Sequence, residues 1–148
     1  MKKLVVVAVL AATCLYQPVK TASAAGVCYS AAAIEAEEAI RFVTDLMVAS
    51  TACRDQTYGY FQQRNKDAII GYQKALITHF HGNAGFDRWN TALANEYSMK
   101  QAGKSTTQVC QGAADIMKQA SAFDVKSFRA FAAAAAASAA PRYQKCGK

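Results

Sequence analysis

The sequence predicts an all-α fold: a single small helical bundle of four to five helices, cross-linked by two disulfides. Apolar residues recur every three or four positions through most of the chain, as they do in amphipathic helices. No segment alternates polar and apolar residues in the way that a half-buried strand does. Five cysteines are present, and four of them follow an N-terminal stretch with the features of an export signal.

The first 25 residues are predicted to be a secretory signal peptide. Two lysines precede an apolar run at residues 4–15, and small residues up to Ala25 provide a cleavage site. The run is too short to span a membrane. Lipoprotein processing at Cys14 is the alternative, although the residues before Cys14 match its signal poorly. We therefore expect a periplasmic or secreted protein, in which residues 26–148 form one domain and no stable membrane insertion remains after cleavage.

The charge of the chain argues against nucleic acid as a partner. The sequence has 17 basic and 10 acidic residues. Loss of three lysines with the signal peptide lowers the net charge to about +4, and the remaining basic residues form no dense cluster. A nucleic-acid-binding domain usually concentrates its positive charge on one surface. The sequence does not identify a partner, and we expect that any partner is another exported protein.

The longest helical pattern covers residues 30–54, with Ser30 as its predicted N-cap. Its apolar stripe has helical spacing and contains Ala36, Ile40, Val43, Met47 and Ser50, widened by Phe42 and Leu46. Glu35, Glu37 and Glu38 lie near the positive end of the helix dipole, and we interpret them as a solvated helix start. Glu37 precedes Arg41 by four residues, a spacing that favours a salt bridge.

Four further helices are predicted along the chain. Asp55 or Thr57 is expected to cap a helix at about residues 58–79, either one bent helix or two short ones. A loop with two glycines precedes the next helix, at about 86–101, which Gly103 is expected to end in a left-handed conformation. Ser105 is expected to cap a helix at about 106–123. An alanine-rich helix at about 124–140, separate from the preceding one or continuous with it, ends at a proline.

The four cysteines outside the signal peptide are expected to form two disulfides. In an up-and-down bundle, the end of the first helix meets the start of the fourth, so Cys53–Cys110 is the preferred pair. Cys28–Cys146 follows by elimination. Strict alternation of helices would place Cys28 and Cys146 at opposite ends, so the last helix must lie across the bundle or the tail must run back. A zinc site is not expected, because zinc-binding cysteines usually occur two to four residues apart.

Several short runs resemble a known group of proteins. They are LMVASTAC at residues 46–53, Tyr58, Tyr60-Phe61, FDRWNTALANEYS at residues 86–98, and Val109-Cys110. In these runs the chain resembles a loosely defined group of small exported helical proteins of Gram-negative, alphaproteobacterial-type bacteria, which has no assigned activity. The resemblance covers about residues 35–110. It implies export and supports the Cys53–Cys110 pair, and it supplies no catalytic residues.

The sequence predicts a non-enzymatic role, because nucleophile, phosphate-binding and metal-binding motifs are absent from it. The first hypothesis is an exported protein that binds other proteins or acts under stress, without catalytic residues, metal or cofactor. The alternative is a small-ligand or haem carrier, with a pocket inside the bundle lined by Trp89, Tyr72 and Met47.

A third hypothesis is a hydrolase whose site forms around the loop between the second and third helices. Its candidate residues are His79, His81, Asp87 and Glu96. The two histidines are two positions apart, so on a helix their side chains diverge. We therefore interpret them as solvent-facing residues at a helix C-terminus, where positive charge is favoured.

Overall fold

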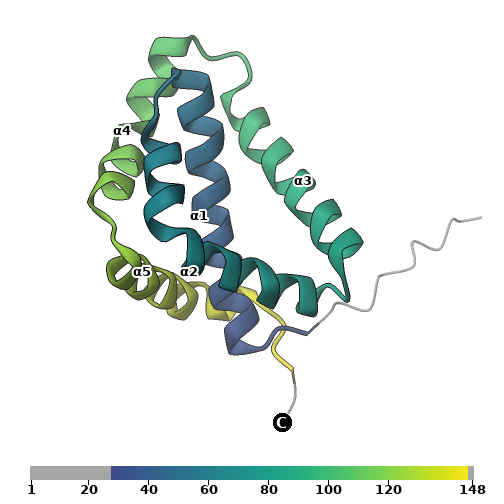
Figure 1. Cartoon of the computed structure of the whole chain (residues 1–148). Coiled ribbons are helices and arrows are strands. Elements are labelled where there is room, and N and C mark those ends of the chain that lie inside the picture. The colour runs from purple at the N-terminus through teal and green to yellow at the C-terminus, as the bar shows by residue number, and fades with distance from the viewer. Residues whose placement is uncertain (1–27, 147–148) are drawn as a thin grey trace, which may run out of the picture.

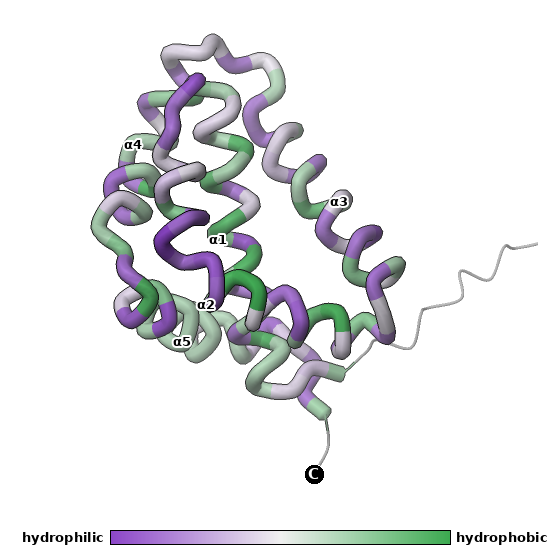
Figure 2. Tube along the Cα trace, in the orientation of Figure 1, coloured by the Kyte–Doolittle hydropathy of each residue, from purple (hydrophilic) through white to green (hydrophobic). Residues whose placement is uncertain are grey.

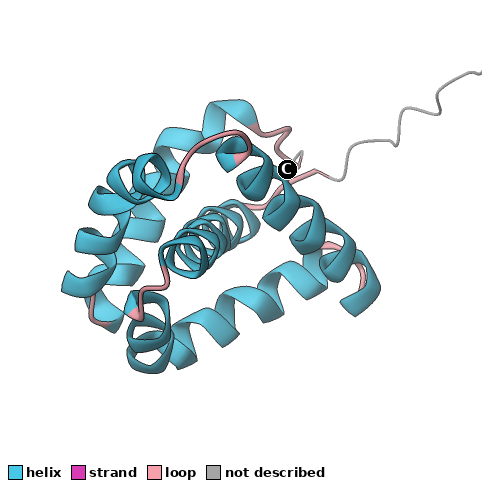
Figure 3. Ribbon diagram, turned by 90° about the horizontal axis from the view of Figure 1, so that it is seen from above, coloured by secondary structure: helices cyan, strands magenta, loops and turns pink. Residues whose placement is uncertain are grey.

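The protein is a bundle of five helices, in which the first helix lies at the centre and contacts the other four. The computed structural model describes residues 28–146, so the predicted signal peptide lies outside the described residues. The elements are α1 (Ala31–Cys53), α2 (Thr57–His79), α3 (Asn83–Gln101), α4 (Thr106–Ala122), α5 (Val125–Ala139) and a 3-10 turn, η1 (Ala140–Arg142). Seen from above, α1 passes through the middle and the other helices surround it (Figure 3). The predicted all-α bundle with two disulfides is confirmed.

The central position of α1 explains why it is buried on more than one side. Ser30 is its N-cap, as predicted, and the Ser30 hydroxyl accepts a hydrogen bond from the backbone N–H of Ala33 at 3.1 Å. Apolar positions continue along the whole helix, whereas α3 carries mostly hydrophilic ones (Figure 2). Only Phe86 and Leu93 of α3 are buried, so α3 packs against the bundle through a narrow contact.

The second and third helices differ from the prediction mainly at their ends. Thr57–His79 is one helix rather than two. Asp55 accepts a hydrogen bond from the Thr57 N–H at 2.7 Å, although Gln56 is the N-cap residue. The following loop is shorter than predicted, because α3 begins at Asn83. A Cβ atom at Gly85 would collide with the carbonyl oxygen of Phe80, so this close approach requires glycine.

Reciprocal side-chain caps separate α4 from α5. Ser105 and Gln108 form a capping box at the start of α4, and Asp124 and Ser127 form another at the start of α5. Because the second box starts a new helix at Val125, α4 and α5 are two helices and not one continuous helix. The guanidinium of Arg64 on α2 donates to two carbonyl oxygens at the end of α4, each at 3.1 Å. That contact ties the end of α4 to α2.

Aromatic side chains fill the core where α1, α2, α4 and α5 meet. Phe61 and Phe128 are fully buried and pack edge to face, with ring centroids 5.0 Å apart. Phe42 of α1 contacts both rings, at 5.6 and 6.1 Å. This cluster joins residues that are far apart in the sequence and fixes α5 against the lower half of α1.

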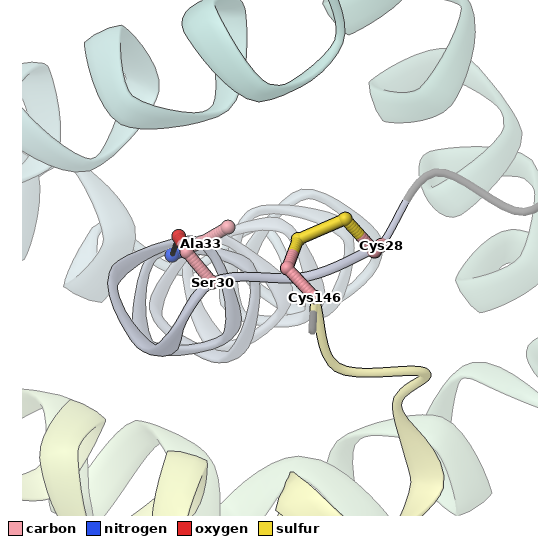
Figure 4. Close-up of a disulfide and its surroundings, with 4 residues drawn as sticks. All are labelled: Cys28, Ser30, Ala33 and Cys146. Carbon is pink, nitrogen blue, oxygen red and sulfur yellow. Dashed lines mark hydrogen bonds between the residues drawn. A yellow bond between two sulfur atoms is a disulfide. The ribbon is translucent and has the colours of Figure 1, made fainter. Parts of the chain in front are cut away.

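Both predicted disulfides are present. Cys53–Cys110 joins the end of α1 to the first turn of α4, as the up-and-down arrangement predicts. Cys28–Cys146 joins the segment before α1 to the C-terminal tail, and Figure 4 shows it beside the Ser30 cap. The two ends of the described chain meet because α5 lies across the lower end of the bundle (Figure 1). An isolated β-bridge between Tyr29 and Lys145 adds a backbone contact beside this disulfide.

Candidate binding groove

A groove runs along one side of α1, between α3 on one wall and α4 and α5 on the other. Figure 1 shows α3 on the opposite side of α1 from α4 and α5. Two cavities of about 580 and 390 Å³ lie in this space and share four lining residues. We call them together the α1 groove, which is lined mainly by Glu37, Glu38, Arg41, Phe42, Asp45, Ala49, Glu96, Tyr97, Lys100, Gln108, Gly112, Ile116, Phe131, Arg142 and Tyr143.

Apolar side chains from three elements face the α1 groove. Phe42 is buried on the α1 side, and Ile116 of α4 and Phe131 of α5 are half-buried on one wall. Tyr97 of α3 is half-buried on the other wall, and burial raises the pKa of its hydroxyl. From Glu37 to Ala49 the groove follows thirteen residues of α1, and the twelve helical steps between them correspond to a length of about 18 Å. The arrangement fits an elongated ligand better than a compact one.

Most charged side chains of the α1 groove are paired with one another. Arg41 contacts Glu37 at 2.7 Å and Lys100 contacts Glu96 at 2.7 Å. Arg142 contacts Glu38 at 3.3 Å. These three ion pairs cancel three positive and three negative charges.

Asp45 is the exception among the half-buried groups. It lines both cavities, and within residues 28–146 it makes no hydrogen bond or salt bridge. Burial raises the pKa of Asp45 above its ordinary value, while the nearby Lys100 ammonium opposes that shift. The Lys100 ammonium is directed to Glu96 and lies 4.6 Å from the ring centroid of Tyr97. The middle of the groove therefore carries a carboxylate without a bonded partner.

A buried carboxylate, Glu37, lies at one end of the α1 groove. Our expectation of a solvated glutamate is wrong for Glu37, whose side chain is 2% exposed. Its Oε1 accepts hydrogen bonds from Nε and Nη2 of Arg41, at 3.0 and 2.7 Å, and from the Tyr143 hydroxyl, at 3.0 Å. The C-terminal tail brings Tyr143 over the start of α1, and that tail covers Glu37. The predicted Glu37–Arg41 salt bridge is confirmed.

Tyr29 and His79 lie beside this carboxylate. The Tyr29 ring packs on the ring of His79, with centroids 4.2 Å apart, and on that of Tyr143, at 4.7 Å. Burial and the Glu37 carboxylate raise the pKa of Tyr29 well above its ordinary value. Burial lowers the pKa of His79, and its Nε2 is buried without a hydrogen-bond partner. Our expectation of a solvent-facing histidine is therefore wrong for His79, whereas His81 is exposed.

The three residues expected to line an internal pocket do not meet in one. Tyr72 is buried and donates a hydrogen bond to Glu35 at 2.9 Å, and it lines a cavity of about 260 Å³ that includes neither Trp89 nor Met47. Burial is the main cause that raises the pKa of Tyr72 to about 12, and the hydrogen bond to the Glu35 carboxylate adds to it. Trp89 stacks on Phe80 at 5.4 Å, near the start of α3. Each of the three positions was identified from an apolar stripe, which indicates burial and not a shared cavity.

The structure brings together only part of the proposed hydrolase site. His79 and His81 line one cavity of about 700 Å³, and neither Asp87 nor Glu96 is among its lining residues. Asp87 and Glu96 are nine positions apart on α3, which separates them by about 13 Å along the helix axis. Both are exposed, and Glu96 is engaged with Lys100. The His79 ring packs on the rings of Tyr29 and Phe80. These side chains do not form a nucleophile–base pair within hydrogen-bond reach.

Over residues 28–146, no group of three or more His, Cys, Asp or Glu side chains is arranged to hold a metal ion. In the same part of the chain, every helix is too short or too polar to cross a membrane. The chain matches no protein-family model, no curated protein and no solved structure at a significant level.

Proposed function

We propose that this protein is an exported, non-enzymatic binding protein that holds a segment of another polypeptide in the α1 groove. The single observation that carries the proposal is the groove itself. About 18 Å of the central helix lies between two walls, with half-buried Ile116, Phe131 and Tyr97 facing the space. This length corresponds to a helical segment of about twelve residues or an extended one of about five.

Two further observations support the other parts of the proposal. Disulfides form and persist mainly in oxidising compartments outside the cytoplasm, and two of them cross-link this small domain. That supports export, as the N-terminal sequence predicts. The dispersal of His79, Asp87 and Glu96 supports a role without catalysis.

Filling the groove with one side chain tests the proposal. Gly112 lies on α4 at the groove, and a Cβ atom there would meet nothing within 4 Å. The Gly112→Trp variant therefore places an indole in the groove without a clash. Gly59→Trp is the matched control, because Gly59 is also helical with open space around its Cβ, on α2 away from the groove. Replacing a helical glycine removes its conformational cost, so both variants should fold.

Binding is measured on an array of overlapping peptides from exported proteins. We expect a subset of peptides to bind the wild type and Gly59→Trp, and to be lost with Gly112→Trp. A stress-related role is tested by the aggregation of a heat-unfolded client protein. The wild type and Gly59→Trp should delay this aggregation, and Gly112→Trp should not. Absence of peptide binding, or equal binding by the two variants, would contradict the proposed function.

The small-ligand carrier remains a second candidate because of a different cavity. A space of about 550 Å³ lies between the start of α1 and α5 and is lined mainly by apolar side chains, among them Tyr29, Ile34 and Ala136. Native mass spectrometry of the protein from its own host tests this candidate. A stoichiometric lipid or chromophore adduct would favour the carrier, and an unmodified mass would favour the polypeptide-binding role.

A further inference from the structure

We infer that the polypeptide held in the α1 groove presents a basic side chain to Asp45, so that the groove selects segments in which lysine or arginine lies among apolar residues. This inference rests on the proposed binding function and adds the chemistry of the partner. It concerns a side-chain amine or guanidinium that belongs to a polypeptide, not a free amine.

The charge balance of the groove carries the inference. Most charged side chains that line the groove are neutralised in three ion pairs, which Arg41, Lys100 and Arg142 form with acidic partners. The remaining ones along the groove are Asp45, Asp115 and Lys104. Asp115 and Lys104 are exposed, so water can solvate them. Asp45 is half-buried, and a half-buried carboxylate is stabilised by a cation more than an exposed one is.

The apolar surface of the groove fits the rest of a basic side chain. Phe42 and Ile116 lie near Asp45 in the larger cavity, and Tyr97 forms part of the opposite wall. Lysine and arginine bury their methylene stems along apolar surface while the charged end reaches a polar group. The 18 Å length also exceeds what a single free amine would fill, which favours a residue within a longer segment.

The inference is tested with the oxidised full domain and fluorescent peptides of about twelve residues, in which one central lysine is flanked by leucine, alanine and glutamine. A second peptide carries Nε-acetyl-lysine at the same position, and butylamine serves as a competitor. Anisotropy is measured for the wild type, Asp45→Asn, Asp67→Asn and Gly112→Trp. Asp67 is the matched control, because it is an exposed carboxylate on α2.

We expect the lysine peptide to bind about tenfold more tightly than the acetylated one. Asp45→Asn should abolish that difference, while Asp67→Asn preserves it. Since Asp45 has no bonded partner in the fold, its replacement should not impair folding. Binding that Gly112→Trp blocks but acetylation does not weaken would overturn the inference and leave the proposed function standing. Full displacement by butylamine would assign the site to free amines instead. If neither peptide binds, both the inference and the proposed function are wrong.

Discussion

Replacing Glu37 by alanine tests the buried ion pair at one end of the α1 groove. The carboxylate is 2% exposed and accepts three hydrogen bonds, two of them from Arg41. Breaking a buried ion pair costs about 3–5 kcal/mol. The Arg41 side chain is 32% exposed, and Tyr143 keeps a second bond to Glu38 at 2.8 Å. We therefore expect a loss of about 3 kcal/mol for Glu37→Ala, at the lower end of that range.

A second variant and a control show whether the stabilisation comes from the burial of the ion pair or only from its i, i+4 spacing. Glu37→Gln keeps an oxygen that can accept from Arg41 and Tyr143, so we expect a smaller loss of about 1 kcal/mol. Glu96 and Lys100 have the same i, i+4 spacing, but their side chains are 50% and 59% exposed. Water and salt screen such a pair, so Glu96→Ala should cause no measurable change.

Urea unfolding with intact disulfides, followed by circular dichroism, gives the free energies. If Glu37→Ala costs no more than Glu96→Ala, the argument from burial is wrong.

Three further predictions concern stability. Replacing Cys53 and Cys110 by serine removes a link across 57 residues and should lower the free energy of unfolding by about 4 kcal/mol in urea titrations; no loss would mean that this disulfide does not constrain the unfolded chain. The pKa of His79 is lowered on folding, so the unfolded state binds more protons and stability should fall as pH decreases through 6.5, an effect that His79→Phe removes. The pKa of Asp45 is raised on folding, so stability should fall as pH rises from 3.8 to the raised value, and Asp45→Asn should be slightly more stable at pH 7. Thermal unfolding of both variants across pH 3–8 checks these signs, and unchanged pH profiles would refute them.

Local signals made three of the helix starts predictable. Ser30 and Ser105 cap their helices as the sequence predicted, and Asp124 caps the last one. A cap depends on one side chain and the three residues that follow it, so the sequence contains all the information needed. Gly103 adopts the predicted positive φ, at 78°, for the same reason.

The burial of Glu37 could not be derived from such local signals. The tail that covers it, with Tyr143, is 106 residues away in the sequence. A polar residue on the outer side of one amphipathic stripe is normally solvated. A further signal was present in the sequence, because α1 also carries apolar residues outside the predicted stripe, and four of them are buried: Ala33, Ile34, Ala39 and Ala49. A helix that is apolar on several sides indicates a central position.

The candidate site was missed because it depends on the relative placement of α3 and α4. The sequence identified Trp89, Tyr72 and Met47 from their apolar environment. Trp89 stacks on Phe80 and Tyr72 bonds to Glu35, so these two side chains hold helices together. Asp45 lies outside the apolar stripe that the sequence predicts for the first helix, and no local signal distinguishes it from other surface carboxylates. Its position in a groove becomes apparent only in the structure, where Tyr97 of α3 and Ile116 of α4 line the same two cavities.

The most direct measurement of the central claim is an NMR titration of the isotopically labelled, oxidised domain with the lysine peptide. We expect amide shift changes along one side of α1 between Glu37 and Ala49, on α3 near Tyr97 and on α4 near Gly112, with α2 near Gly59 unchanged. Shift changes confined to the alanine-rich surface of α5, or no changes at peptide concentrations in the millimolar range, would contradict the claim that the α1 groove is the binding site.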